Sequence, residues 1–237
     1  MSDFKAGVRA GAEAGAARFS HGTADAAGRA FAPTGGRRFA GALMAPLQLI
    51  VPVLLLLATF MAAFLYGGTH AGWPLIAPWL TVGEWLVPLS FLAIHITNRR
   101  YGAAYALAQI AGAWAFGLAA LWAMRSDLSA LVGWSLPDAR ILAGFGFALF
   151  LAQIVSVAVF DRTRGPVWWH APLYASFWGG VIFCGAGFPA AFAGTAFDWV
   201  QPMLVYLGVM IAGSLVLLVP YWALRAIVPP MPGFGGY

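Results

Sequence analysis

Glu84, Pro88, Phe91, His95 and Asn98 are spaced by four, three, four and three residues, which is the period of one helical face. A carboxylate, an imidazole and an amide on one face could form one wall of a polar cavity. His95 could bind a proton or accept a hydrogen bond from a ligand. The structural alternative, which we favour for a single histidine, is that His95 donates to a neighbouring backbone carbonyl and Glu84 faces headgroups.

Other polar side chains lie in apolar stretches further along the chain. Gln153 and Ser156 are three residues apart and share a helical face, and Gln109 is isolated in its own apolar run. Because uncompensated polar groups in hydrocarbon cost several kcal/mol, each requires a partner or a role. Hydrogen bonding between helices would account for them without a substrate.

A haem site is a further possibility for the histidines. A b-type haem needs two axial ligands on facing helices, and only His95 and His170 are suitably placed in the sequence. One such pair is weak support, so we expect no cofactor. We find no metal-ligand cluster, Walker motif or nucleophile elbow in a plausible context, and we expect a protein that is not an enzyme.

The composition requires elements that lie in lipid. Hydrophobic residues make up 62% of the 237 positions and charged residues only 9%, against about 25% charged in soluble domains. We therefore predict an all-α, polytopic membrane protein with six transmembrane helices. The predicted spans are residues 43–66, 78–97, 103–124, 141–160, 167–192 and 199–224.

Lys and Arg predict the orientation of these spans. Of the 13 basic residues, all except Arg125 and Arg140 lie in the segments on the same side as the N-terminus. By the positive-inside rule we expect both termini in the cytoplasm. Four arginines mark the two cytoplasmic turns after spans two and four: Arg99, Arg100, Arg162 and Arg164.

Three regions follow from this assignment. Residues 1–41 are a basic, Ala- and Gly-rich cytoplasmic extension, either disordered or a helix on the lipid surface. Residues 42–228 form the six-helix membrane domain, and residues 229–237 are a short C-terminal tail. The basic residues lie at loop positions, so we expect no nucleic-acid partner.

Three stretches together resemble a known family. They are FLAIHITNRRYG, AQIVSVAVFDRTRGPVWWHAPL and DWVQPMLVYLGVMIAGSLVLLVPYWAL, in this order along the chain. They are similar to the vitamin-uptake-type (VUT) family of bacterial queuosine precursor transporters. The resemblance covers about residues 75–225. It implies a six-helix protein of the bacterial inner membrane that imports 7-deazaguanine bases such as preQ0 and preQ1.

The departures from this family concern the expected substrate cavity. Such transporters usually carry Asp where this chain has His95, Ser156 and Phe183, and often a basic residue where it has Met210, whereas Gln153 is retained. A site that binds an amide-rich base needs buried acceptors, and it loses several kcal/mol when they are removed.

Two functions therefore remain open. The first is import of a small heterocyclic solute with altered specificity, driven by a gradient, by metabolic trapping or by an external partner. Its candidate binding residues are His95, Asn98, Gln109, Gln153, Ser156 and Glu84. The second is a non-transporting accessory subunit of a larger inner-membrane complex, respiratory or photosynthetic, that reuses the transporter fold.

Overall fold

The computed structural model describes residues 35–71 and 77–231, with side chains from Leu47 onward. The chain divides into two compact units between Leu47 and Gln48, and the packing described below lies within the second unit. Most of the predicted N-terminal extension and the last residues of the predicted tail lie outside the described residues. The predicted boundary at residues 41 and 42 falls inside the first described helix.

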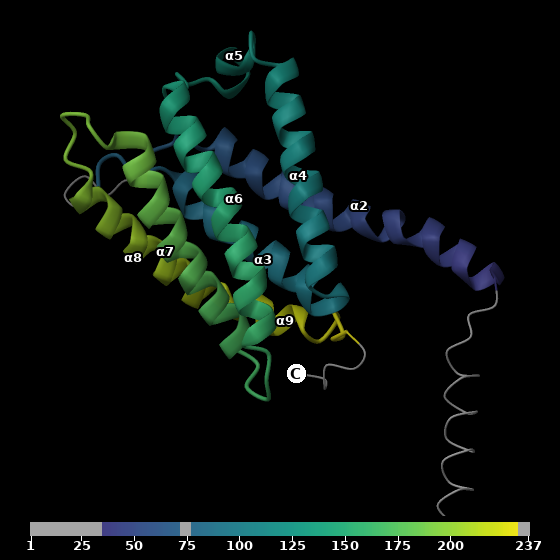
Figure 1. Cartoon of the computed structure of the whole chain (residues 1–237). Helices are drawn as coiled ribbons and strands as arrows, with labels where there is room; N and C mark the ends of the chain where they lie inside the picture. The colour runs from purple at the N-terminus through teal and green to yellow at the C-terminus, as the bar shows by residue number, and fades with distance from the viewer. Residues whose placement is uncertain (1–34, 72–76, 232–237) are drawn as a thin grey trace, which may run out of the picture. The chain divides into compact units, whose positions relative to one another are not determined.

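The described helices are α2 (Gly35–Leu65), α3 (Val82–Tyr101), α4 (Ala103–Ala123), α5 (Leu128–Val132), α6 (Ala139–Arg162), α7 (His170–Phe192), α8 (Val200–Val216) and α9 (Leu218–Leu224) (Figure 1). Within residues 35–71 and 77–231 there is no β-strand, and the one isolated bridge pairs His70 with Thr81. The prediction of an all-α protein is confirmed.

Five described segments are long and apolar enough to cross a membrane: Leu47–Leu65, Ala103–Ala123, Ala139–Arg162, His170–Phe192 and Val200–Leu224. The chain is thus a multi-pass helical membrane protein. The last segment contains both α8 and α9. Helix α3, the predicted second span, is not among the five, because Glu84 near its start, Arg99 and Arg100 at its end and polar residues between them lower its hydrophobicity.

The first predicted turn is displaced in the structure. The sequence predicted a turn at residues 97–100 to which Gly102 contributes; in the structure α3 continues to Tyr101 and the chain reverses at Gly102. Gly102 has φ of 87° and its N–H donates to the Asn98 carbonyl oxygen at 2.9 Å. Only glycine adopts this backbone conformation without strain, so the turn is placed by Gly102 and not by the polar residues before it.

Helices α6 and α7 pack along most of their length, and α8 lies against α7 (Figure 1). Small residues permit the close approach of α6 and α7. A Cβ atom added to Gly187 of α7 would lie 2.7 Å from Cδ1 of Phe145 on α6. A Cβ added to Gly144 of α6 would lie 3.1 Å from the Ala191 nitrogen. Small residues allow helices to approach closely where no hydrophobic effect drives them together.

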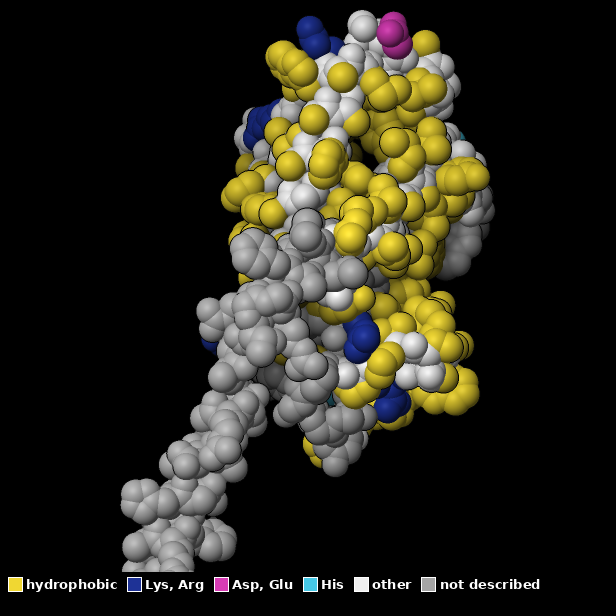
Figure 2. Space-filling model, turned by 90° about the vertical axis from the view of Figure 1, so that its right-hand side faces the viewer, with side chains coloured by type: hydrophobic (Ala, Val, Ile, Leu, Met, Phe, Trp, Pro, Cys, Tyr) yellow, Lys and Arg dark blue, Asp and Glu magenta, His cyan; other side chains and the backbone are white. Residues whose placement is uncertain are grey.

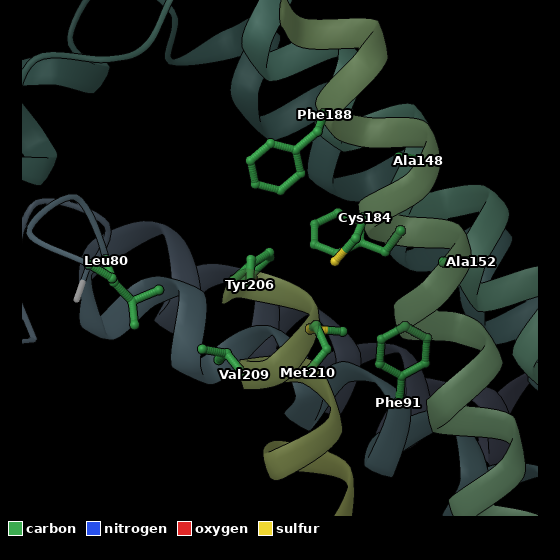
Figure 3. Close-up of a cluster of buried hydrophobic side chains, with 11 residues drawn as sticks. Leu80, Phe91, Ala148, Ala152, Cys184, Phe188, Tyr206, Val209 and Met210 are labelled. Carbon is green, nitrogen blue, oxygen red and sulfur yellow. The ribbon is translucent and has the colours of Figure 1, made fainter. Parts of the chain in front are cut away.

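The largest apolar cluster joins α3, α6, α7 and α8 (Figure 3). Phe91 of α3 lies near Met210 of α8, and both side chains are 1% exposed. Phe183 and Tyr206 contact each other with ring centroids 5.8 Å apart. A second cluster, which includes Leu56, packs α2 against α3, α4 and α6.

Large apolar side chains cover the exterior of these helices. Phe116 is 65% exposed, Trp122 71%, Phe147 66% and Trp222 61%. Figure 2 shows one face on which hydrophobic side chains predominate and Lys and Arg side chains are few. An apolar surface of this extent is typical of contact with lipid or with another membrane protein.

Candidate functional site

His95 is held at the interface between α3 and α6. Its Nε2 lies 2.8 Å from Oγ of Ser156, and the two residues are 1% and 0% exposed. The imidazole stacks on Phe160, with centroids 5.1 Å apart and an interplanar angle of 24°. The hydrogen bond and the stacking together fix the ring, so His95 joins two helices.

A small cavity adjoins His95. It measures about 10 Å³ and is bounded by side chains of α3, α7, α8 and α9, among them Ser176, Ser214 and Tyr221. A space of this size holds about one water molecule. It does not fit a haem on His95. His170, the other proposed axial ligand, lies at the start of α7 with its ring against Trp169 and Tyr174.

Asn98 is completely buried and links three segments. Its Nδ2 donates to the Val157 carbonyl oxygen of α6 at 3.3 Å. Nη2 of Arg164 donates to both Oδ1 and the backbone oxygen of Asn98, each at 2.6 Å. Nε of Arg164 pairs with Asp161 at 2.9 Å. The Asn98 side chain therefore ties the end of α3 to α6 and to the loop that follows α6.

The two glutamines also make contacts between helices. Nε2 of Gln109 on α4 donates to the Pro52 carbonyl oxygen of α2 at 2.8 Å. Nε1 of Trp114 on α4 donates to Oε1 of Gln153 on α6 at 2.8 Å. Each glutamine keeps one buried amide atom without a hydrogen-bond partner, namely Oε1 of Gln109 and Nε2 of Gln153.

Glu84 does not join these residues. Its carboxylate accepts hydrogen bonds from the backbone N–H (2.5 Å) and the hydroxyl of Thr81, so it caps the start of α3. Thr81 and Glu84 form a capping box, which satisfies backbone donors at the helix N-terminus. The sequence left two environments open for Glu84, the end of a cavity wall or the headgroups; in the structure its carboxylate caps the start of α3.

The positions at which the resembled family carries further polar residues are apolar and packed. Phe183 is 4% exposed and Met210 is 1% exposed. Phe183 contacts Phe145 as well as Tyr206, with centroids 5.8 Å apart in each case. These side chains contribute hydrophobic contacts and no hydrogen-bond acceptor to the interior.

The four arginines predicted to mark turns have different surroundings. Arg99 is 4% exposed and its Nε donates to the Val228 carbonyl oxygen at 3.1 Å. Arg164 binds Asn98, as described above. Arg162 is exposed at the end of α6, and Arg100 is half-buried. Arg99 and Arg164 thus make hydrogen bonds between segments of the fold. Their predicted role as markers of cytoplasmic turns did not indicate these contacts.

The structure brings His95, Asn98 and Ser156 together at the α3–α6 interface, with Gln153 on the same helix as Ser156. Gln109 bonds to α2 from α4, and Glu84 lies at the opposite end of α3. Sequence reasoning missed Trp114, the partner of Gln153, because it shares no periodic spacing with another polar residue. In the part of the chain that is described, no three His, Cys, Asp or Glu residues group to hold a metal ion.

Comparison of the chain with protein-family models, with curated proteins and with solved structures finds no match.

Proposed function

We propose that this chain is a structural, non-transporting subunit of a larger complex in the bacterial inner membrane. In this proposal it derives from a fold like that of the queuosine precursor transporters and catalyses no reaction. The observation that carries the proposal is the use of the five buried candidate residues. His95, Asn98, Gln109, Gln153 and Ser156 all make hydrogen bonds within the helical bundle.

These buried groups would lose hydrogen bonds on binding a solute. A ligand that displaced the His95–Ser156 bond would leave buried polar atoms unsatisfied unless it replaced every bond. Each unsatisfied buried group costs about 1–3 kcal/mol. The cavity beside His95 holds about one water molecule, so a heterocycle would also have to move the surrounding helices.

The apolar exterior supports the same proposal. Exposed Phe116 and Trp122 on α4 and Phe147 on α6 offer large hydrophobic contact area. Aromatic residues are enriched in the cores of protein interfaces. The proposed partner is therefore an integral membrane complex whose own helices present apolar side chains.

One observation favours import of a small heterocycle as the second candidate. Oε1 of Gln109 is an acceptor and Nε2 of Gln153 is a donor, and both are buried without a partner. A base bearing amide-like edges offers complementary groups. In this alternative, rearrangement of α4 relative to α6 would open the binding site.

Uptake of labelled preQ1 by bacterial cells that lack their own importer separates the two candidates. The arms are the native protein, His95→Asp and Gln153→Leu, each matched for amount in the membrane. The structural proposal expects background uptake in every arm. Uptake by the native protein that Gln153→Leu abolishes would establish transport and overturn the structural proposal.

A positive test of the structural role uses deletion of the gene. We expect less assembled respiratory or photosynthetic complex on native gels, and restoration by the full chain. Normal amounts and sizes of all these complexes in the deletion strain would contradict the proposal.

We further propose six spans, including α3, with both termini in the cytoplasm. An odd number of spans would place the termini on opposite sides. Fusions of green fluorescent protein to each end should both fluoresce, and alkaline phosphatase fusions at the same ends should both be inactive. Active phosphatase at one end would favour the five segments that are most apolar.

A further inference from the structure

A groove of about 230 Å³ lies away from the His95 cavity. Three segments form it: the middle of α2, the last turn of α3 and the chain that follows α9. Its lining residues are Val51, Pro52, Leu55, Ile96, Thr97, Arg100, Tyr101, Ile227, Val228 and Pro229. It shares no lining residue with the cavity beside His95.

The wall of the groove after α9 is fixed to α3 by two hydrogen bonds. Nε of Arg99 donates to the Val228 carbonyl oxygen at 3.1 Å, and the Met231 N–H donates to the Arg99 carbonyl oxygen at 2.9 Å. Arg99 therefore holds the far wall of the groove and is not itself a lining residue.

Among the described residues that line the groove, Arg100 is the only one with a charged side chain. Among the described residues it makes no hydrogen bond and no ion pair, and its guanidinium lies 5.5 Å from the centroid of the Tyr101 ring. This contrasts with the neighbouring Arg99 and with Arg164, whose partners are given above. A half-buried guanidinium against apolar walls presents its donors to an anion.

The remaining lining is almost entirely hydrophobic and reaches the exterior. Val51 is 71% exposed, Leu55 46% and Ile227 74%. The hydroxyl of Thr97 donates back to the Ala93 carbonyl oxygen of its own helix. The groove thus has a cationic end at the close of α3 and apolar sides along α2.

We propose that this groove binds an anionic phospholipid. Its phosphate lies on Arg100 and one acyl chain lies along Val51, Leu55 and Ile227. Basic pockets between helices at a membrane surface bind anionic headgroups, and exposed apolar patches mark sites of membrane interaction. This assignment does not depend on the proposed function.

Charge complementarity selects the anionic class. A zwitterionic lipid such as phosphatidylcholine brings a quaternary ammonium group as well, and no described residue that lines the groove carries a carboxylate to receive it. The phosphate of phosphatidylglycerol would accept hydrogen bonds from a planar guanidinium, which binds phosphate through two donors. The lipid seals the junction between α2, α3 and the chain after α9.

Native mass spectrometry of the full chain tests the proposal. The protein is released from nanodiscs that contain equal amounts of phosphatidylglycerol and phosphatidylcholine, and retained lipid is counted. The variants are Arg100→Gln and the matched control Arg162→Gln, which removes the same charge from an exposed position at the end of α6. Val51→Trp fills the apolar side of the groove while Arg100 remains.

We expect the native protein and Arg162→Gln to retain phosphatidylglycerol in preference to phosphatidylcholine. Arg100→Gln should reduce that preference about tenfold, because it removes the cation that attracts the net negative charge of phosphatidylglycerol, whereas phosphatidylcholine is neutral overall. Val51→Trp should reduce retention of both lipids. Inorganic phosphate added in excess should not displace the lipid.

Four results would overturn the proposal. Equal losses in Arg100→Gln and Arg162→Gln would indicate a diffuse charge effect. Equal retention of the two lipids would indicate a purely apolar groove. Displacement by inorganic phosphate would indicate an anion site without an acyl chain. Retention of no lipid by the folded native protein would assign the groove to another part of this chain or to a protein partner.

Discussion

His95 and Ser156 form a hydrogen bond of 2.8 Å between α3 and α6, at positions that are 1% and 0% exposed. The two residues are 61 positions apart in the chain. Because neither side chain reaches solvent, each depends on the other for part of its hydrogen bonding. The bond therefore fixes how α3 sits on α6.

Replacement of Ser156 by Ala should destabilise the protein by about 1–3 kcal/mol, because a buried ring nitrogen loses its partner. Thermal unfolding in mild detergent, followed by circular dichroism, measures the change. Ser129→Ala on exposed α5 is the control and should leave the transition unchanged.

The paired variant His95→Phe with Ser156→Ala sharpens this test. Removing both polar partners can be nearly neutral, so the pair should be more stable than Ser156→Ala alone. If the pair is less stable than Ser156→Ala alone, the bond does not account for the effect.

Gly179 and Phe91 give a prediction about the packing of α7 on α3. A Cβ at Gly179 would lie 2.5 Å from Cε1 of Phe91, a ring that is 1% exposed. Gly179→Ala should therefore cost about 1–3 kcal/mol by overpacking. The same unfolding assay applies.

Gly185 provides the matched control on the same helix. A Cβ there would meet nothing within 4 Å, so Gly185→Ala should stabilise α7 by roughly 0.5–1 kcal/mol through helix propensity. Equal effects of the two substitutions would refute the packing argument.

Gly102 gives a prediction about the turn between α3 and α4. At φ of 87°, an alanine would be strained, and its Cβ would lie 2.9 Å from Sδ of Met231. Gly102→Ala should lower the free energy of unfolding by about 1–3 kcal/mol. Gly165→Ala, in the loop after α6 with nothing within 4 Å of its Cβ, should have little effect.

Trp114 and Gln153 give a prediction about the contact between α4 and α6. Trp114→Phe removes the indole donor and leaves the whole Gln153 amide unsatisfied, because Nε2 already lacks a partner. We expect a loss of about 1–3 kcal/mol.

The control for Trp114 is Trp122→Phe on the same helix. Trp122 is 71% exposed, so its substitution should change stability by less than about 0.5 kcal/mol. In a Gln153→Leu background the Trp114→Phe effect should shrink, and an unchanged effect would show that the indole acts through packing alone.

Sequence by itself determined the helical class and the membrane environment. A chain with 62% hydrophobic and 9% charged residues must place its apolar surface in lipid or in contact with partners, and helices satisfy the backbone within each segment. The apolar runs also located the helices to within a few residues at most ends. The face shared by His95 and Asn98 was correctly predicted, because both side chains bond to α6.

Only the tertiary structure decided the partners of the polar residues. Hydrogen bonds such as that from Trp114 to Gln153, 39 residues away, depend on which helices adjoin, and helical periodicity carries no such information. The cap that Glu84 forms with Thr81 is not a tertiary effect, because the Thr-x-x-Glu pattern that carries it is local in the sequence. Arg99 and Arg164 were predicted only to mark cytoplasmic turns. In the folded chain they donate hydrogen bonds to a carbonyl oxygen and to an amide oxygen from segments distant in sequence.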